Sequence, residues 1–246
     1  MSGSPNGARR APTRHVQVLE NRMQGEAAAL TLTTLRFLTH RAFPALFPRY
    51  LIGLYHSMRT AGAVMEAARA RSVSLARDCP VAARLVPYWT RHIREEAGHD
   101  EWLLADLSRL GADPERVRVS TPAPEIAELM GTLHFWIQHA HPVAALAYFY
   151  VVERNPPTVE LLDWIVQSGG IPREALQTFY RHASIDIGHA RELEDLIDSL
   201  PLAPAHLDLM VVSATTVVRQ LSRMYEELIG RSDTRRQERR RASTRK

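Results

Sequence analysis

The sequence is poor in cysteine, because Cys79 is the single one among 246 residues. One cysteine cannot form a disulfide within the chain, and it cannot build a metal site from several thiolates. The sequence also lacks the apolar core of a secretory signal at its N-terminus. Residues 27–38, the most apolar early run, fall short of the ~20 residues needed to cross a bilayer. We therefore predict a soluble, cytoplasmic protein without a membrane span.

Strand signals are equally scarce. No stretch alternates apolar and polar residues as a half-buried strand does, and the sequence contains no glycine-rich phosphate loop or nucleophile elbow. Apolar residues instead recur at helical spacing between prolines and glycines. This pattern predicts helices over residues 16–41, 49–72, 81–110, 125–139, 143–154, 158–168, 172–200 and 205–229.

The domain organisation predicted from this pattern is simple. A hydrophobic fraction of 45% suits one sizeable core, so we predict one all-α domain over residues 15–230, a bundle of about seven to nine helices. Residues 1–14 and the Arg-rich residues 231–246 are predicted to be disordered ends. The apolar segment 205–229 is also a candidate interface for a homodimer.

The positive charge of the chain is confined to its ends. The net charge is +4, but residues 231–246 carry +6 and residues 1–14 carry +3, which leaves about −5 for residues 15–230. We therefore expect no nucleic-acid partner for the folded part, and only salt-sensitive, non-specific phosphate contacts for the tail. A non-catalytic binding protein that uses this tail is one alternative function.

A histidine and carboxylate pattern occurs twice, in RHIREEAGHDEW (residues 91–102) and RHASIDIGH (residues 181–189). Both segments read His-x3-carboxylate-x2-His. Because each helical residue turns about 100°, the three side chains of one copy fall within about 60° of arc on one helix face. The two copies consist of His92, Glu96 and His99, and of His182, Asp186 and His189.

On each predicted helix, the face that carries the histidines and the carboxylate continues into a row of apolar residues. Both faces are therefore predicted to point into the core. Ionisable groups in a core are costly unless they are paired or bound to a metal. Satisfied core histidines or surface ion pairs are the alternative for one copy, but two copies favour a metal site. Imidazole and carboxylate ligands without thiolate suit iron or manganese, and also zinc or nickel.

A site for two metal ions needs a further carboxylate. Helix bundles that hold two irons use Glu-x-x-His pairs on facing helices, and this sequence has one pair in each copy of the pattern. Glu153 follows the apolar run ALAYFYVV and is the best additional candidate. The predicted metal ligands are His92, Glu96, His99, Glu153, His182, Asp186 and His189, and the carboxylates Glu96, Glu153 and Asp186 are also the catalytic candidates. Asp106 is expected to support the site or to form a salt bridge.

These segments resemble the haem-oxygenase-like iron-containing redox enzymes over roughly residues 40–200. The third family motif, H-x3-[DE]-x2-H, is matched in full by residues 182–189, and the middle glutamate is matched by Glu153. The first family motif is often Glu-x6-His; His99 fits it, but His92 stands where the glutamate is expected. Either His92 replaces that ligand, or Glu96 or Glu95 supplies the carboxylate.

The resemblance implies a haem-oxygenase-like bundle and a non-haem diiron oxidase or oxygenase. Such an enzyme activates O2 at two Fe(II) ions and oxidises a small organic substrate. Relatives on this scaffold also include metal-independent enzymes, namely cofactor-free oxidases and thiaminase-like hydrolases. The thiaminase-like enzymes use a cysteine nucleophile, and Cys79 lies away from both histidine segments in the sequence.

Overall fold

A computed structural model describes residues 14–154 and 156–243. Nine α-helices in this part of the chain have eleven or more residues, which confirms the predicted all-α bundle. The elements are α1 (His15–Leu38), α2 (Phe43–Leu75), α3 (Pro80–Glu95), α4 (His99–Arg109), the short α5 (Pro114–Arg118), α6 (Pro124–His139), α7 (Val143–Glu153), α8 (Val159–Gly169), the 3₁₀ turn η1 (Arg173–Leu176), α9 (Gln177–Ser199) and α10 (Pro204–Ser243).

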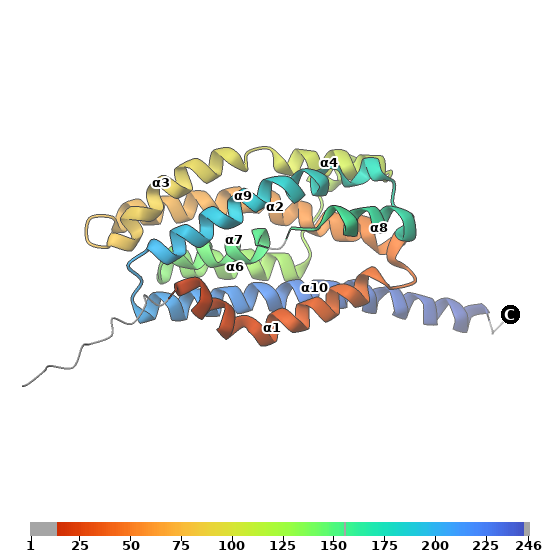
Figure 1. Cartoon of the computed structure of the whole chain (residues 1–246). Coiled ribbons are helices and arrows are strands. Elements are labelled where there is room, and N and C mark those ends of the chain that lie inside the picture. Colours follow the sequence, from red (N-terminus) through yellow and green to blue (C-terminus); the bar gives the residue numbers. More distant parts are fainter. Residues whose placement is uncertain (1–13, 155, 244–246) are drawn as a thin grey trace, which may run out of the picture.

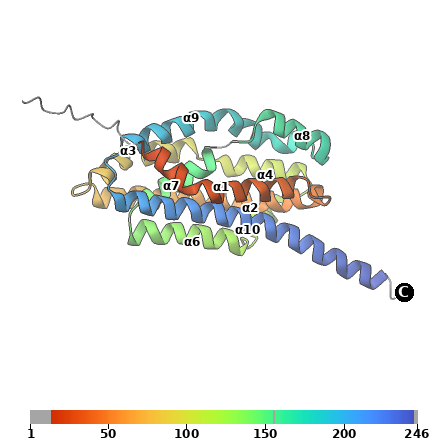
Figure 2. The same cartoon turned by 60° about the horizontal axis from the view of Figure 1, so that its bottom comes forward.

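The long helices run along one direction of an elongated molecule, with α7 in the interior (Figure 1). Every residue of α7 from Val143 to Tyr150 is buried, because this helix is apolar on all sides and is covered by its neighbours. Helices α1 and α10 lie side by side in Figures 1 and 2, while α3, α4 and α9 lie across the bundle from them in Figure 1. Glu153, the last residue of α7, therefore ends a helix that is surrounded by protein.

The prediction of one continuous helix over residues 81–110 is wrong, because a turn interrupts the helix between the end of α3 at Glu95 and the start of α4 at His99. Gly98 has φ of 86°, a left-handed conformation that only glycine adopts without strain. The turn lets His99 begin a new helix instead of continuing the stripe of His92. The assumption that His92, Glu96 and His99 lie on one helix face therefore fails, although all three side chains reach the same place.

Other predicted boundaries also differ. Helix α2 begins at Phe43 and contains Pro48 in its second turn, where the missing N–H removes one backbone hydrogen bond from the helix. The predicted loop over residues 112–124 contains the short helix α5. Helix α10 does not end at Gly230 but continues to Ser243, so residues 231–243 form a helical extension instead of a disordered tail. This extension projects beyond the bundle in Figure 2. Residues 1–13 and 244–246 lie outside the described residues.

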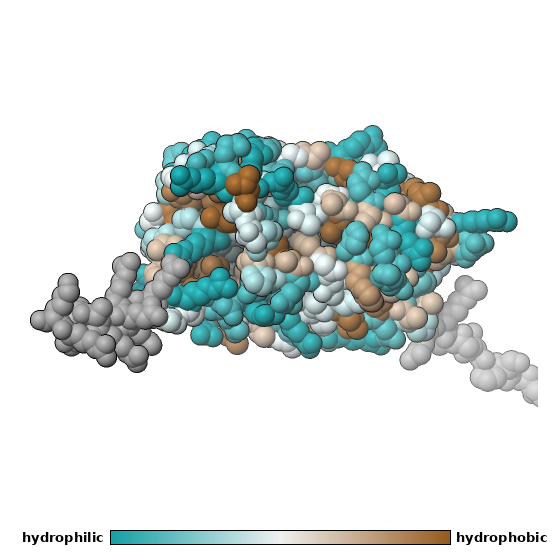
Figure 3. Space-filling model, turned by 180° about the vertical axis from the view of Figure 1, so that it is seen from behind, coloured by the Kyte–Doolittle hydropathy of each residue, from teal (hydrophilic) through white to brown (hydrophobic). Residues whose placement is uncertain are grey.

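The apolar side of α10 serves the core of its own chain. Met210, Ala214, Val217 and Val218 are buried against neighbouring helices, so the feature that suggested a dimer interface is covered within the chain. Dimerisation itself stays a prediction. The face in Figure 3 is largely hydrophilic, with hydrophobic residues scattered over it. Within the described residues, no helix combines the length and apolarity that a bilayer span requires.

The buried apolar residues form two clusters instead of one. One cluster contains residues of α3, α6, α7 and α10, such as Trp89 and Phe149. The other contains residues of α4, α8 and η1, such as Leu103 and Ile165. Helices α1 and α2 contribute to both clusters. The histidine and carboxylate residues lie where α3, α4, α7 and α9 meet between these clusters.

The break at Gly98 is open to a direct test. Replacing Gly98 with Ala should lower the free energy of unfolding by about 1–2 kcal/mol, because an L-residue is strained at positive φ. Gly25 is a matched control, since it lies within α1 and an added Cβ meets no atom within 4 Å. The Gly25→Ala variant should be neutral or slightly more stable. Urea unfolding measures both variants, and equal stability of the two would contradict the role of Gly98.

Candidate metal centre

Four segments bring the predicted residues together. His92 lies in the last turn of α3, and Glu96 and His99 flank the break before α4. Glu153 closes α7. The remaining three residues lie along α9, on the side that faces these ends. All seven predicted side chains meet here; six of them form two groups of three, and the seventh, Asp186, lies on α9 between His182 and His189.

The first group consists of His92, His189 and Glu153. The Nε2 atom of His92 lies 3.0 Å from Oε1 of Glu153. The rings of His92 and His189 are 5.2 Å apart between centroids, and Nδ1 of His189 lies 4.0 Å from Oε2 of Glu153. His92 is 1% exposed and Glu153 is 7% exposed, so this contact is shielded from water. Two imidazoles and one carboxylate therefore converge from α3, α7 and α9.

The second group consists of His99, His182 and Glu96. The Nδ1 atom of His99 lies 3.0 Å from Oε2 of Glu96, and the rings of His99 and His182 are 5.0 Å apart between centroids. One potential ligand atom from each of the three residues lies within 4.8 Å of the others. The composition of this group matches that of the first, with two imidazoles and one carboxylate.

Glu96 connects the two groups. Its Oε2 faces His99, while its Oε1 lies 3.5 Å from Nδ1 of His189 in the first group. Asp186 is buried on the turn of α9 between His182 and His189. Glu95 also comes within 3.7 Å of His92 and 3.9 Å of His189, but its side chain is 36% exposed against 18% for Glu96. The geometry therefore favours Glu96 as the shared carboxylate.

Several polar atoms at this place have no hydrogen-bond partner in the described residues. They include Oε2 of Glu153, Oδ1 of Asp186 and Nδ1 of His189, and all three atoms are buried. Orphaned polar atoms in a core are costly, and three of them around one point indicate a group that they would bind together. A cation fits this donor set, because the atoms are carboxylate oxygens and imidazole nitrogens.

The pKa values of the three carboxyl groups are shifted by burial and by their neighbours. Burial, together with the nearby charges of Glu153 and Glu96, raises the pKa of Asp186 to about 8. Burial also raises the pKa of Glu153, although the hydrogen bond with His92 opposes this. For Glu96, burial is the largest single cause and acts in the same direction, but the hydrogen bond from His99 and the charges of His99, His92 and His182 together outweigh it, and the pKa is lowered. Asp186 and Glu153, but not Glu96, thus resist ionisation.

A hydrogen-bonded relay orients His182. Its Nδ1–H donates to the carbonyl of Thr178 at 2.8 Å, which leaves the lone pair of Nε2 free for the site. The backbone N–H of Thr178 donates to Oδ2 of the fully buried Asp106 at 2.8 Å, and Arg109 donates to the other oxygen of Asp106. Asp106 thus joins α4 to the start of α9, and it is both the support and the salt-bridge partner that we expected.

Aromatic rings, which the sequence patterns did not identify as part of the site, pack against His92 and His99. The ring of Tyr88 stacks on His92 with centroids 5.2 Å apart, and the edge of His92 meets Phe149 at 5.1 Å. Trp102 stacks on His99 at 4.0 Å. Tyr88 precedes His92 by four residues and Trp102 follows His99 by three, which is the spacing of neighbours on one helix face. This spacing could have indicated from the sequence alone that Tyr88 contacts His92 and that Trp102 contacts His99.

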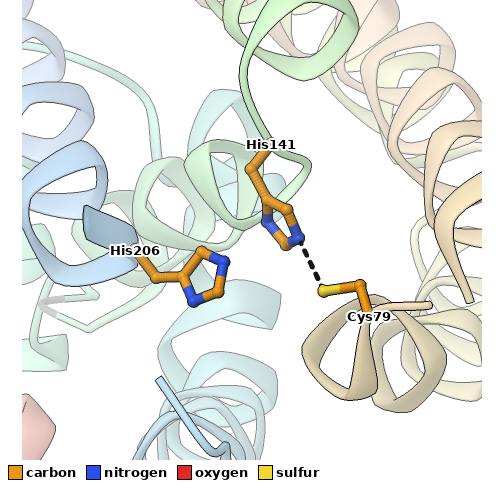
Figure 4. Close-up of side chains that lie close together, drawn as sticks. All are labelled: Cys79, His141 and His206. Carbon is orange, nitrogen blue, oxygen red and sulfur yellow. Dashed lines mark hydrogen bonds between the residues drawn. The ribbon is translucent and has the colours of Figure 1, made fainter. Parts of the chain in front are cut away.

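A second cluster lies away from this centre and joins Cys79, His141 and His206 (Figure 4). The Nδ1 atoms of His141 and His206 accept the backbone N–H groups of Val143 and Ala203 at 3.1 and 3.2 Å. Both neutral rings therefore carry their proton on Nε2, and the Nε2–H of His141 faces the sulfur of Cys79 at 3.4 Å. Donating N–H groups cannot bind a cation, so hydrogen bonds account for this cluster.

Comparisons with known proteins identify the family of the chain. Residues 49–221 match the model of the iron-containing redox enzyme family, and the chain belongs to this family. Among curated proteins, none shows a significant match to the chain. The family match covers both histidine segments and Glu153.

Solved structures share the haem oxygenase-like fold. A domain of unknown function from Shewanella denitrificans aligns with a TM-score of 0.75 and 21% identity, covering 89% of this chain and 93% of that chain. A TenA homologue from Pseudomonas syringae aligns with a TM-score of 0.67 and 17% identity, over 89% and 93% of the two chains. A haem oxygenase from Synechocystis in complex with haem aligns with a TM-score of 0.60 and 14% identity, over 94% and 100%.

Replacing Asp186 with Asn should stabilise the metal-free protein and weaken metal binding. The folded protein holds Asp186 with a pKa of about 8, well above the value of about 3.9 in an unfolded chain. The carboxyl group therefore favours folding when protonated, and this contribution is lost as the pH rises from about 4 to 8. At pH 8 the Asn variant should be more stable by roughly 1–4 kcal/mol.

Thermal unfolding of metal-free protein at pH 5 and pH 8 measures this effect, and the gap between variant and wild type should widen at the higher pH. Asp195 is the control, because it lies exposed on the same helix. Asp195→Asn should change neither stability nor metal affinity. An Asp186→Asn variant that is less stable without metal would contradict the burial cost.

His141 should make the fold sensitive to acid. Burial, with smaller contributions from His206 and Arg71, lowers its pKa to about 4, whereas an unfolded histidine titrates near 6.5. The unfolded chain binds the extra proton, so stability is lost as the pH falls from about 6.5 to 4. His141→Asn retains an acceptor for Val143 and should flatten this dependence in urea unfolding. Exposed His134 is the control, and an unchanged slope in the His141 variant would refute the interpretation.

Proposed function

We propose that the chain is a non-haem diiron oxidase or oxygenase that uses O2 to oxidise a small organic substrate. One observation carries this proposal: six of the seven side chains form two groups of equal composition, each with two imidazoles and one carboxylate, and the Glu96 carboxylate reaches both groups. One cation would leave one group unsatisfied. Two cations, with a carboxylate between them, would satisfy both.

The residues that would hold each iron follow from the two groups. His92, His189 and Glu153 would bind one ion, and His99 and His182 would bind the other. Glu96 would bridge the two, and Asp186 would supply a further oxygen from α9. In this assignment His92 takes the ligand position that is a glutamate in many family members, and Glu96 supplies the carboxylate.

Two ferrous ions bound in this way would supply the electrons that reduce dioxygen. The protein would provide the surroundings that this chemistry needs. Trp89, Phe149 and Tyr88 shield the first group from water. Thr178 and Asp106 hold His182 in one tautomer, as described above. Carboxylates with raised pKa values would exchange protons for metal, because the ligand atoms must be deprotonated to bind.

The arrangement gives less support to a thiaminase-like reaction. That reaction requires a cysteine nucleophile next to a carboxylate, whereas Cys79 lies against His141 and does not line the cavity that reaches Glu96 and Glu153. A Cys79→Ala variant is therefore expected to keep its activity.

Metal analysis of the purified protein tests the diiron proposal. After anaerobic loading with Fe(II), the wild type should retain about two iron ions per chain, as in two-iron bundles. His182→Ala should lower the content to about one, and His92→Ala should do the same through the other group. Glu96→Ala should impair both positions. Mössbauer spectra should show that the two single-histidine variants lose different ferrous sites.

The exposed His134 provides a matched control, since His134→Ala should keep the full iron content. Oxygen uptake by the iron-loaded wild type in the presence of substrate is the second readout. A wild-type protein that retains no iron, or variants from both groups that lose the same site, would overturn the proposal.

A further inference from the structure

A large cavity adjoins the candidate metal centre. Its volume is about 1050 Å³, at the upper end of the range for ligand pockets. It lies between the two apolar clusters, because its wall includes Met65 and Phe149 of the first cluster and Phe47 and Ile165 of the second. The cavity therefore interrupts the core along the molecule instead of forming a shallow surface depression.

The same cavity reaches the proposed metal ligands. Glu96, His99, Glu153, His182 and Asp186 all belong to its wall. Most of the remaining wall is apolar and comes from α1, α2, α8 and α10, with residues such as Leu30, Met58, Leu161 and Val218. One continuous space thus has ligand atoms at one place and hydrocarbon side chains over most of the rest.

Several polar groups elsewhere on the described wall already have partners within the chain. Arg154 pairs with Glu20, which also accepts a hydrogen bond from Tyr150 at 2.9 Å. Arg59 donates to the hydroxyl of Tyr55 at 2.9 Å and to the carbonyl of Arg118 at 3.0 Å.

Several hydroxyl groups on the wall also form hydrogen bonds within the chain. Ser57 and Tyr148 bond to each other at 3.2 Å, and Thr31 donates to the carbonyl of Ala27 at 3.0 Å. A ligand with polar groups along its length would have to displace these internal bonds, each at a cost of about 1 kcal/mol. An aliphatic ligand would leave them intact and would gain from burial.

We propose that the substrate is a long-chain aliphatic molecule, whose chain occupies this cavity and whose polar end lies at the metal centre. The inference rests on the proposed function for the position of the polar end. The position of the chain rests on the wall of the cavity alone. The oxidised carbon atoms would accordingly be those next to the polar end of the molecule.

Straight-chain primary alcohols of six to twelve carbons are suitable probes, because they are uncharged and do not require iron to bind. Their affinity for metal-free protein, measured by titration calorimetry, should increase about fourfold per added methylene, from ~0.8 kcal/mol per buried CH2. Gly62 lines the cavity on α2, and a Cβ added there meets no atom within 4 Å. Gly62→Leu should therefore fold normally, fill part of the space and lower the affinity for the longest alcohol by about tenfold or more.

Gly131 is the matched control. It lies on α6 outside the cavity wall, and an added Cβ there also meets no atom within 4 Å. Gly131→Leu should bind the alcohols as the wild type does, and circular dichroism should show equal helix content in both variants. Affinity that does not depend on chain length, or equal binding by the two leucine variants, would overturn the proposal.

The position of the polar end has its own readout. In Co(II)-loaded protein, a ten-carbon alcohol should shift the visible absorption bands of the metal, while in Gly62→Leu the shift should require higher alcohol concentrations. Bands that stay unchanged at saturating alcohol would refute the placement at the metal centre. The iron content of separately Fe(II)-loaded protein from the same purification shows whether the diiron proposal has failed on its own.

Discussion

The burial of carboxylates beside imidazoles is the constraint on which the rest of this structure depends. Glu153 and Asp186 are buried, and each has an oxygen atom that no group in the described residues satisfies. An arrangement of this kind is costly without a cation. Two sets of contacts hold the histidine side chains in place. Hydrogen bonds run from Asp106 through Thr178 to His182, and aromatic rings stack on His92 and His99.

The same constraint explains why the core is divided. A continuous apolar core would pack better, but it would leave no space for a ligand beside the buried polar groups. Long helices solve this problem, because α1 and α2 pass through both apolar clusters and keep them together across the cavity. Stability then comes from the two clusters, and the space between them is the cavity in which we propose that the substrate binds.

Much of the site could be predicted from the spacing of a few residues. The pattern in residues 182–189 lies on an uninterrupted helix, so its predicted geometry was sound. The first copy was misjudged because Gly98 breaks the helix, and its left-handed conformation is invisible in a periodicity argument. At Gly230 the error was the opposite one: we predicted a helix end there, but a helix can contain a glycine, and α10 continues past this residue.

By itself, the sequence determined the all-α fold, the family and the side chains that gather at the centre, since helical periodicity and ligand chemistry are local properties. Only the tertiary structure decided how those side chains divide into two groups, that Glu96 rather than Glu95 joins them, and that Asp106 reaches the start of α9. These features depend on the packing of helices distant in sequence. The cavity belongs to the same class, because its wall combines residues from almost every helix and no single segment encodes its shape.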